Sequence, residues 1–547
     1  MSVERNNDEG HSSFRYKMIA PTSHVDTFAQ DHLPPVTEWP HLSFSSPHIM
    51  YPDRLNAACK LLDDAIAEGH GSRTAILESG SSWTYSDLLR ASDEVAHVLV
   101  HEEGLVPGNR VLLMASNSGM LAASWLAVLR AGGIAVTAMP LLRAHELGQI
   151  AIKAKIDHAL CDSKALPEVR QSAVQTGFLS RIRAWGNGDL EKSMTSYTQP
   201  FCPIDTAIDD VAIIAFTSGT TGTPKATMHF HRDILAMADI VGRSLLHTSL
   251  DDVYVGSPPL GFTFGLGALL VFPLRFRAAA AYVSRPTADL LLGAIEQYRA
   301  TALFTSPTMY RTLIDVLPRF NTTSLRRCIS AGEPLSRATS DSWHKATGIR
   351  LTDGIGSTEM IHIFIGAEGY EAKPGATGKP LPGYEAVVLD IHGKPQTIGS
   401  GRLAVRGPTG CRYLGDPRQK DYVKDGWNVT GDLYRIDQDG YFWFESRSDD
   451  MIISSGYNIA SPEVESALQS HEAVLECAVI GAPDPVRGQI VKAYVVLQSG
   501  WSPGEILATR LQNFVKAQIA PYKYPRAIEF VKSLPKPPTG KIQRHIV

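Results

Sequence analysis

The sequence predicts an α/β protein with a large N-terminal domain of parallel-rich sheets and helices, a distorted β-barrel subdomain, and a small, mobile C-terminal α+β domain. Three observations support this fold class. The 547 residues are too many for one hydrophobic core. A content of 44% hydrophobic and 20% charged residues is typical of globular proteins. Strand-like and helix-like segments alternate over most of the chain, which indicates parallel sheets covered by helices.

The alternation is clear in the first third of the chain. Residues 110–116, "RVLLMAS", read as a strand, residues 120–132 as a buried helix, and residues 134–140, "IAVTAMP", as the next strand. These segments begin the predicted large domain.

The same pattern returns near residue 300 and then changes. Residues 300–307 and 325–332 read as strands, with a helix over 308–317 between them. From about residue 385 the chain reads as antiparallel hairpins, with "DQDG" at 437–440 as a turn. We assign these hairpins to the barrel-like subdomain.

The end of the chain predicts a compact α+β unit. Two strands, 476–482 and 490–498, precede a helix over 503–519. Asp449 lies in a polar stretch before this unit, and we expect it to be a hinge about which the unit moves as one body. The predicted division is an N-terminal arm of residues 1–45 that packs late or stays mobile, a large domain of residues 46–448, and a small domain of residues 449–547.

Composition excludes several classes of protein. A net charge of −4 gives no sign of binding to nucleic acid or to an anionic membrane. The six cysteines are far apart and contain no CxxC pair, so we expect buried free thiols in a reducing compartment. The start of the chain lacks a secretory signal and no apolar run could span a bilayer, which favours a cytoplasmic enzyme. The "HELGQ" segment at 145 lacks the second histidine of a zinc protease.

The segment "AFTSGTTGTPKATMHF", residues 215–230, has the composition of a phosphate-binding loop. A strand ends in a cluster of glycine and hydroxyl residues, followed by Lys225. Backbone amides freed by glycine, hydroxyl donors and a cation suit phosphate oxygens. The loop is not a Walker A motif, because Pro224 precedes the lysine and Ala226 follows it. A solvated linker is the structural alternative.

This loop resembles the phosphate-binding motif of the acyl-adenylate-forming superfamily, which includes acyl- and aryl-CoA ligases, peptide-synthetase adenylation domains and luciferases. Other motifs of that superfamily follow in the expected order over roughly residues 50–547. They are "SAGEP" at 330–334, "DGIGSTE" at 353–359, "TGD" at 430–432, "SRSDDMIISSGYNI" at 446–459 and "PKPPTGKIQR" at 535–544. The resemblance implies an enzyme that uses ATP, Mg²⁺ and CoA.

The resemblance also implies roles for individual residues. Lys541, on a stiff Pro-rich arm, would neutralise charge in the adenylation step with Thr358 and Glu359, and Glu359 would hold Mg²⁺. Gly456 and Tyr457 would line the path of the CoA thiol, with Arg487 and Lys492 available for CoA phosphates. The implied ATP site comprises Thr217, Ser218, Gly219, Thr220, Thr221, Gly222, Lys225, Gly332, Glu333, Pro334, Asp353, Gly354, Asp432 and Arg447.

Two positions depart from the superfamily pattern. Ala226 and Ser446 each stand where glycine is common. Both residues are small, so we expect altered loop mobility and intact chemistry.

Within the superfamily, several segments resemble in sequence those of benzoate and 2-aminobenzoate (anthranilate) CoA ligases. The pocket implied for a flat ring consists of Phe262, Gly354, Ile355, Gly356 and His362, with Phe264 nearby. His362 either bonds the acid or is a satisfied core histidine. No acidic residue that would bind an α-amino group is evident in these segments.

The sequence is also compatible with two other functions. A carrier-loading ligase would pass the acyl group to the thiol of an acyl carrier protein instead of CoA. A non-catalytic nucleotide-binding protein would need to have lost the lysines and carboxylates that this chain retains.

Overall fold

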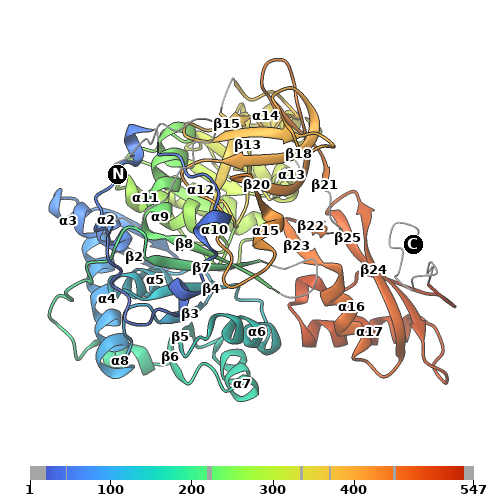
Figure 1. Cartoon of the computed structure of the whole chain (residues 1–547), viewed down its shortest axis with the longest axis horizontal. Coiled ribbons are helices and arrows are strands. Elements are labelled where there is room, and N and C mark those ends of the chain that lie inside the picture. The colour runs from blue at the N-terminus through green and yellow to red at the C-terminus, as the bar shows by residue number, and fades with distance from the viewer. Residues whose placement is uncertain are drawn as a thin grey trace.

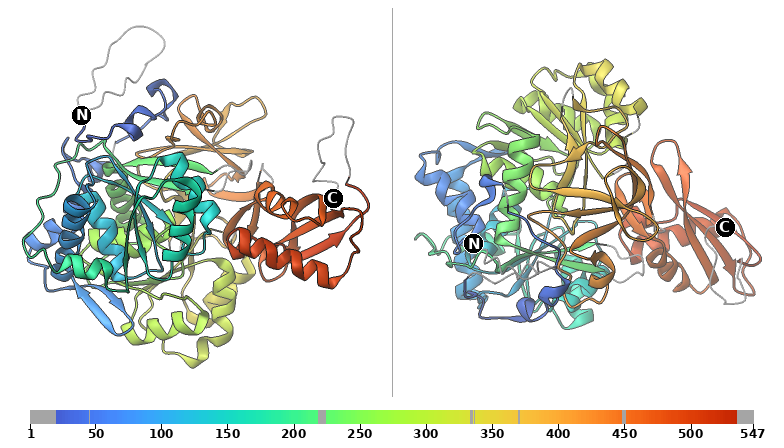
Figure 2. Two further views of the ribbon diagram at one scale, coloured as in Figure 1. Left: turned by 90° about the horizontal axis from the view of Figure 1, so that it is seen from below. Right: turned by 45° about the horizontal axis from the view of Figure 1, so that its top comes forward.

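The computed structural model describes residues 20–44, 46–217, 224–332, 335, 337–368, 371–447 and 451–534. The large domain contains two sheets in which most neighbouring strands are parallel, as the alternating pattern predicts (Figure 1). A third, antiparallel sheet lies beside them, and the small domain follows at one side of the large one (Figure 2).

The first sheet has the strand order β6-β5-β3-β4-β7-β8. Its pairs are parallel except β7–β8, which are antiparallel and flank the expected phosphate-binding loop. The strands are β3 (Arg110–Met114), β4 (Ile134–Ala138), β5 (His158–Asp162), β6 (Arg181–Trp185), β7 (Val211–Thr217) and β8 (Lys225–Phe230).

The second sheet has the order β15-β14-β13-β12-β11-β9-β10-β1-β2. The run from β13 to β1 is parallel, and antiparallel strands close both edges. The strands are β1 (Thr74–Glu78), β2 (Ser81–Thr84), β9 (Val253–Gly256), β10 (Ala279–Ala281), β11 (Ala302–Thr305), β12 (Arg327–Ser330), β13 (Leu351–Gly356), β14 (Ile363–Ala367) and β15 (Lys379–Pro380).

The subdomain expected as a distorted barrel is built on an antiparallel sheet of order β17-β16-β18-β20-β19, with β21 paired to β20. The predicted turn at 437–440 joins β20 to β21, and Asp437 N donates to Tyr441 O at 3.0 Å. The strands are β16 (Glu385–Leu389), β17 (Pro395–Gln396), β18 (Gly399–Arg406), β19 (Val423–Lys424), β20 (Trp427–Ile436) and β21 (Phe442–Arg447).

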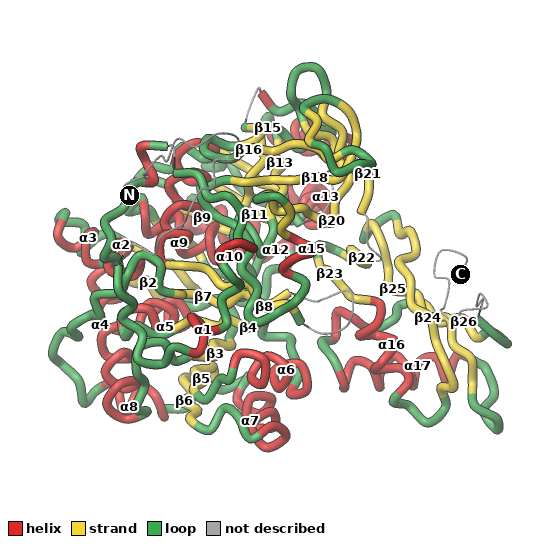
Figure 3. Tube along the Cα trace, in the orientation of Figure 1, coloured by secondary structure: helices red, strands yellow, loops and turns green. Residues whose placement is uncertain are grey.

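Helices cover the faces of the large-domain sheets (Figure 3). The buried helix expected after residue 120 is α5, which Ser118 caps by accepting a hydrogen bond from Leu121 N; such a cap contributes about 1 kcal/mol. The large-domain helices are α1 (Phe28–Asp31), α2 (Ala57–Leu61), α3 (Asp63–Ala67), α4 (Tyr85–His97), α5 (Gly119–Arg130), α6 (Ala144–Ala154), α7 (Leu166–Thr176), α8 (Asp189–Met194), α9 (His231–Met237), α10 (Thr263–Leu266), α11 (Phe272–Arg275), α12 (Ala288–Tyr298), α13 (Pro307–Val316), α14 (Arg337–Thr347) and α15 (Gln419–Tyr422). The 3₁₀-helices are η1 (Val36–Glu38), η2 (Pro47–Ile49) and η6 (Leu317–Arg319). The π-helical segments are η3 (Val98–Glu102), η4 (Ala238–Leu245) and η5 (Gly267–Val271).

The small domain is the α+β unit that the sequence predicts. Its sheet has the order β23-β22-β25-β24 with β26 paired to β25. It has a core of its own, which includes Ile459, Leu468, Val479, Val495 and Leu511. The elements are β22 (Met451–Ser454), β23 (Tyr457–Ala460), α16 (Ser461–Gln469), β24 (Val474–Asp484), β25 (Gly488–Leu497), α17 (Glu505–Gln518), η8 (Pro521–Lys523) and β26 (Ala527–Phe530).

The described part of the N-terminal arm, residues 20–44, packs on the large domain. Thr22 and Ser23 donate hydrogen bonds to the buried carboxylate of Asp210. Ser43 N donates to Gly407 O at 3.0 Å, which ties the arm to the antiparallel sheet. The arm therefore joins two of the large-domain sheets.

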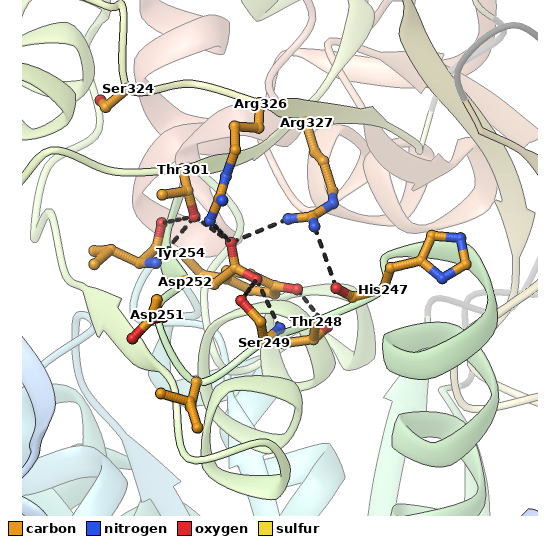
Figure 4. A network of polar contacts seen from close by, with 12 residues as sticks. His247, Thr248, Ser249, Asp251, Asp252, Tyr254, Thr301, Ser324, Arg326 and Arg327 are labelled. Carbon is orange, nitrogen blue, oxygen red and sulfur yellow. Dashed lines mark hydrogen bonds and ion pairs between the residues drawn. The ribbon is translucent and has the colours of Figure 1, made fainter.

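A buried carboxylate organises the amino ends of the second sheet (Figure 4). Asp252, just before β9, accepts hydrogen bonds from Thr301 at 2.6 Å and Arg326 at 2.7 Å. Arg327 lies 3.0 Å from the same oxygen, and Ser249 N donates to the other oxygen. Strands β9, β11 and β12 are thus fixed together at the edge opposite the one where ligands bind in such sheets.

All six cysteines are free thiols. Four are buried as expected, but Cys59 is half-buried and Cys202 is exposed, so the expected burial is wrong for these two. Among the described helices, none combines the length and apolarity needed to cross a membrane.

Candidate active site

A cavity of about 570 Å³ lies where strands from both large-domain sheets end. It opens beyond the carboxyl ends of β4 and β7 in the first sheet and of β9, β11, β12 and β13 in the second. Small-domain residues close another side. Ligand sites of open α/β sheets lie at this edge, and the volume is typical of a small-molecule site.

The predicted phosphate loop borders this cavity. Thr217 ends β7, pairs with Lys225 at the start of β8, and lines the cavity. The Lys225 ammonium lies 5.5 Å from the ring centre of Tyr413. The predicted residues Ser218, Gly219, Thr220, Thr221 and Gly222 lie outside the described part of the chain.

The residues expected to hold Mg²⁺ follow β13. Thr358 lines the cavity, and the side chain of Glu359 is buried next to it. Tyr413 donates a hydrogen bond to Glu359 Oε1 at 2.6 Å. Burial and the Glu359 carboxylate raise the pKa of Tyr413 above its ordinary value, so this hydroxyl stays protonated.

This donor set fits Mg²⁺ bound with a nucleotide. Within the described residues, no group of three or more His, Cys, Asp and Glu side chains could hold a metal ion alone. Mg²⁺ commonly takes one or two protein carboxylates together with substrate phosphates, and Glu359 supplies one such carboxylate beside Thr358.

A buried polar chain holds Thr358 in place. His229 on β8 contacts Thr358 O through Nε2 at 2.8 Å, and its Nδ1 lies 3.8 Å from Asp233. Arg412 donates to Asp233 at 2.8 Å. Burial alone would raise the pKa of Asp233, but Arg412, His229 and Arg232 hold it below its ordinary value. Asp233 therefore remains an anion that orients its two neighbours.

The residues expected on the adenine side lie on or after two strands, β12 and β13. Gly332 follows β12 and lines the cavity, whereas Glu333 and Pro334 are not among the described residues. Asp353 pairs with Ser330 across β12 and β13, and burial raises its pKa to about 8. Gly354 is packed against Ile363, where a Cβ would come within 2.9 Å.

The pair expected to bind ribose lies at the open end of the β20–β21 hairpin. Asp432 pairs with Arg447, the last residue of β21. The backbone N–H of Asp432 donates a hydrogen bond to Thr430 Oγ1 at 3.2 Å, which fixes the backbone of the "TGD" segment.

The cavity has an aromatic end, where Phe262, Phe264, Gly356 and His362 line it. The other two predicted pocket residues, Gly354 and Ile355, are not among the residues that line the cavity. Gly356 must be glycine, because a Cβ would meet the carbonyl of His362 at 2.7 Å.

His362 has the packing of a core histidine, and its expected contact with the acid stays a prediction. Its ring packs against Phe272 at 4.7 Å between centres, and Nε2 lies 3.3 Å from Phe264 O. Burial lowers its pKa to about 4, so the ring is neutral and Nε2–H donates to that carbonyl. Nδ1 is then a buried acceptor, and it has no hydrogen-bond partner among the described residues.

The small domain presents a tight turn to the same cavity. Ser455 and Gly456 have φ values of 50° and 81°, as a two-residue hairpin turn of type I′ requires, and Tyr457 follows. Arg487 donates to Ser455 Oγ at 3.1 Å and fixes the turn. The Tyr457 ring lies 6.3 Å from that of Phe262. Gly456, Tyr457 and Arg487 all line the cavity, whereas Lys541 and Asp449 lie outside the described residues.

Several residues in or beside the site carry no signal in the sequence. Tyr413 and Arg412 come from an irregular segment with no pattern of its own. Glu146, Glu463 and Lys523 form an ion cluster on the cavity wall, and Lys523 is separated from Glu146 by 377 positions in the chain. No local signal could reveal that contact.

Two family models match most of the chain. The family model "AMP-binding enzyme" matches residues 63–413, and the model "AMP-binding enzyme C-terminal domain" matches residues 463–541. The chain belongs to the AMP-binding, adenylate-forming enzymes. Within them it is an AMP-forming acid–CoA ligase.

Individual relatives cover nearly the whole chain. Benzoate–CoA ligase of Thauera aromatica is 33% identical, over 92% of this chain and 97% of its own. The mitochondrial acyl-coenzyme A synthetase ACSM3 of Mus musculus is 32% identical, over 85% and 83%. The crystal structure of the anthranilate CoA ligase AuaEII in complex with anthranoyl-AMP superimposes with a TM-score of 0.72 at 30% identity, covering 92% of this chain and 98% of that one.

Proposed function

We propose that this ligase activates a benzoate-type acid, with 2-aminobenzoate first, through an aryl-AMP intermediate to its CoA thioester. AMP and pyrophosphate are released. The observation that carries the proposal is the aromatic end of the cavity, which Phe262, Phe264, Gly356 and His362 line and which suits an aromatic ring. The benzoate and anthranilate ligases among the relatives support the same class of acid.

In the first half-reaction the aryl carboxylate attacks the α-phosphorus of ATP and pyrophosphate leaves. Lys225 and the loop before it bind phosphate oxygens, and Thr358 bonds the α-phosphate. Glu359 would hold Mg²⁺, which would supply positive charge to the phosphates. Lys541 would neutralise charge that develops between the carboxylate and the phosphate.

The nucleoside would be bound by the strand ends described above. Asp432 accepts hydrogen bonds from the ribose hydroxyls, and Arg447 adds a donor to the same sugar. Gly332, Glu333, Pro334, Asp353 and Gly354 form the adenine side.

In the second half-reaction the CoA thiol attacks the acyl carbon, the C–S bond forms and AMP leaves. We propose that the small domain rotates about Asp449 between the two steps, which withdraws Lys541 and brings Gly456 and Tyr457 to the acid. The contact of Tyr457 with the cavity and with Phe262 supports this arrangement for the thioester step. Arg487 lies where it can serve the CoA entrance.

The first experiment is pyrophosphate release with ATP, Mg²⁺ and CoA across a panel of acids, with the thioester followed by mass. The panel contains benzoate, 2-aminobenzoate, 2-hydroxybenzoate, a 4-hydroxycinnamate, a medium-chain fatty acid and several amino acids. Highest turnover on an ortho-substituted benzoate, with a CoA thioester as product, is the expected result. A preference for the fatty acid contradicts the proposed pocket.

The same assay tests the alternative acceptor. Adenylation without a CoA thioester would indicate that the thiol belongs to an acyl carrier protein. Adding a phosphopantetheinylated carrier protein and following its mass then identifies that reaction.

A further inference from the structure

A buried ion cluster joins the two domains beside the cavity. The Lys523 ammonium lies 2.7 Å from Glu146 Oε1 and 2.6 Å from Glu463 Oε1. The three side chains are only 6%, 5% and 15% exposed. Glu146 belongs to α6 of the large domain, whereas Glu463 and Lys523 belong to α16 and η8 of the small domain.

The carboxylates on both sides of Lys523 are held in place. The second oxygen of Glu146 accepts a hydrogen bond from Arg143 N at 3.0 Å and caps α6. Glu463 is in the first turn of α16, where the helix dipole favours an anion. Burial raises the pKa of Glu463 to about 7, against the opposing effect of Lys523. Lys523 is therefore the cation that compensates the Glu146 anion across the domain boundary.

Two neighbouring contacts share the same boundary. The rings of Tyr522 and Tyr457 stack at 4.3 Å between centres, so the residue before Lys523 touches the thioester-side turn. Arg311 of α13 donates to Val486 O at 2.8 Å. The ion cluster thus lies in the same interface that brings Tyr457 to the acid pocket.

We propose that Glu146 and Lys523 are positioning residues that hold the small domain in its thioester-forming arrangement. This inference rests on the proposed function, because it requires that the small domain alternates between two positions. When the domain rotates to deliver Lys541, Lys523 leaves Glu146 but keeps Glu463, which moves with it. The contact between Lys523 and Glu146 therefore exists in one arrangement and favours it over the other.

The variant Glu146→Gln tests the contact while keeping the fold. Glutamine retains the oxygen that caps α6 and removes the charge that faces Lys523. Loss of a favourable contact in one of two states shifts their populations, here by on the order of tenfold. A buried ammonium must become accessible before an amine-reactive reagent can modify it.

The first readout is the labelling rate of Lys523 by an acetylating reagent, followed by mass spectrometry without any substrate. We expect labelling of Lys523 to be about tenfold faster in Glu146→Gln than in the wild type, with Lys60 unchanged as an internal standard. Equal rates overturn the proposal.

A matched control uses the neighbouring carboxylate. Glu168 accepts a hydrogen bond from Ala144 N at 2.9 Å, so Glu168→Gln perturbs the same start of α6 without touching the small domain. Lys523 labelling should stay at the wild-type rate in this variant. Faster labelling in Glu168→Gln would mean that any loosening of α6 exposes Lys523, and would overturn the proposed role of Glu146.

The second readout separates the half-reactions. Thioester formation from preformed acyl-adenylate should fall about tenfold in Glu146→Gln, whereas exchange of pyrophosphate into ATP should not fall. Equal loss in both half-reactions overturns the proposal. If the wild type shows neither half-reaction with any acid, the proposed function fails, but Lys523 labelling still decides whether Glu146 holds the domains together.

Discussion

Replacing His362 by leucine removes a buried acceptor, Nδ1, at the aromatic end of the cavity. Leucine has a similar bulk and can fill the space against Phe272 and Phe264. The imidazole is neutral above about pH 5, because burial lowers its pKa to about 4. Its Nε2–H donates to Phe264 O, and Nδ1 is buried without a hydrogen-bond partner among the described residues. We expect Nδ1 to accept a hydrogen bond from the ortho amino group when the acid is bound.

The structure sets the size of the expected effect. A buried amino group that loses its acceptor costs about 1–3 kcal/mol. At about 1.4 kcal/mol for each factor of ten, kcat/KM for 2-aminobenzoate should fall about five- to hundredfold. Benzoate has no ortho donor, so its kcat/KM should change by less than about threefold.

The assay is pyrophosphate release for wild type and His362→Leu with benzoate and 2-aminobenzoate at several pH values. The ratio of the two kcat/KM values should fall in the variant and should be constant between pH 6 and pH 9, where the wild-type ring is neutral throughout. An equal loss with both acids would show that His362 only supports the pocket wall. An unchanged ratio would refute the proposed hydrogen bond.

Three further predictions concern other parts of the chain. Lys541→Ala should reduce adenylation far more than thioester formation from preformed acyl-adenylate, and equal losses would contradict the proposed division of labour. Tyr413→Phe removes the hydrogen bond to Glu359 and should change the Mg²⁺ concentration needed for half-maximal adenylation, with little effect on KM for CoA. Asp252→Asn should lower the stability of the large domain by about 2–3 kcal/mol at pH 7, because Arg327 loses a buried anion. Burial would raise the pKa of Asp252, but Thr301, Ser249 and the two arginines hold it below its ordinary value of 3.8. The stabilising effect of the Asp252 anion is therefore fully present above pH 3.8 and is lost as the pH falls through the lower folded pKa. A stability difference between wild type and variant that shrinks at pH 6 would contradict this assignment.

Much of the fold could be predicted from local pattern. Strand β3 and helix α5 are continuous apolar runs bounded by polar residues, and the turn at 437–440 has the composition that a hairpin requires. These features depend on residues close together in the chain.

Residues of the candidate site could be predicted only where they belong to short sequence motifs. Thr217, Lys225, Thr358 and Glu359 stand in short motifs, and the fold brings them to one edge. The partner of Glu359, in contrast, is Tyr413, which follows it by 54 positions and is placed by tertiary packing. Long-range contacts of this kind leave no periodic trace in a sequence.

The small domain has its own core, and its contacts with the large domain include the Lys523–Glu146 ion pair and the Arg311–Val486 hydrogen bond. The residues that would choose the acid lie in the large domain, and the turn that would admit the thiol lies in the small one. The two properties are therefore separable by recombination: a hybrid that takes its last domain from a relative should keep the acid preference of this chain, provided that the donor supplies a cation opposite Glu146.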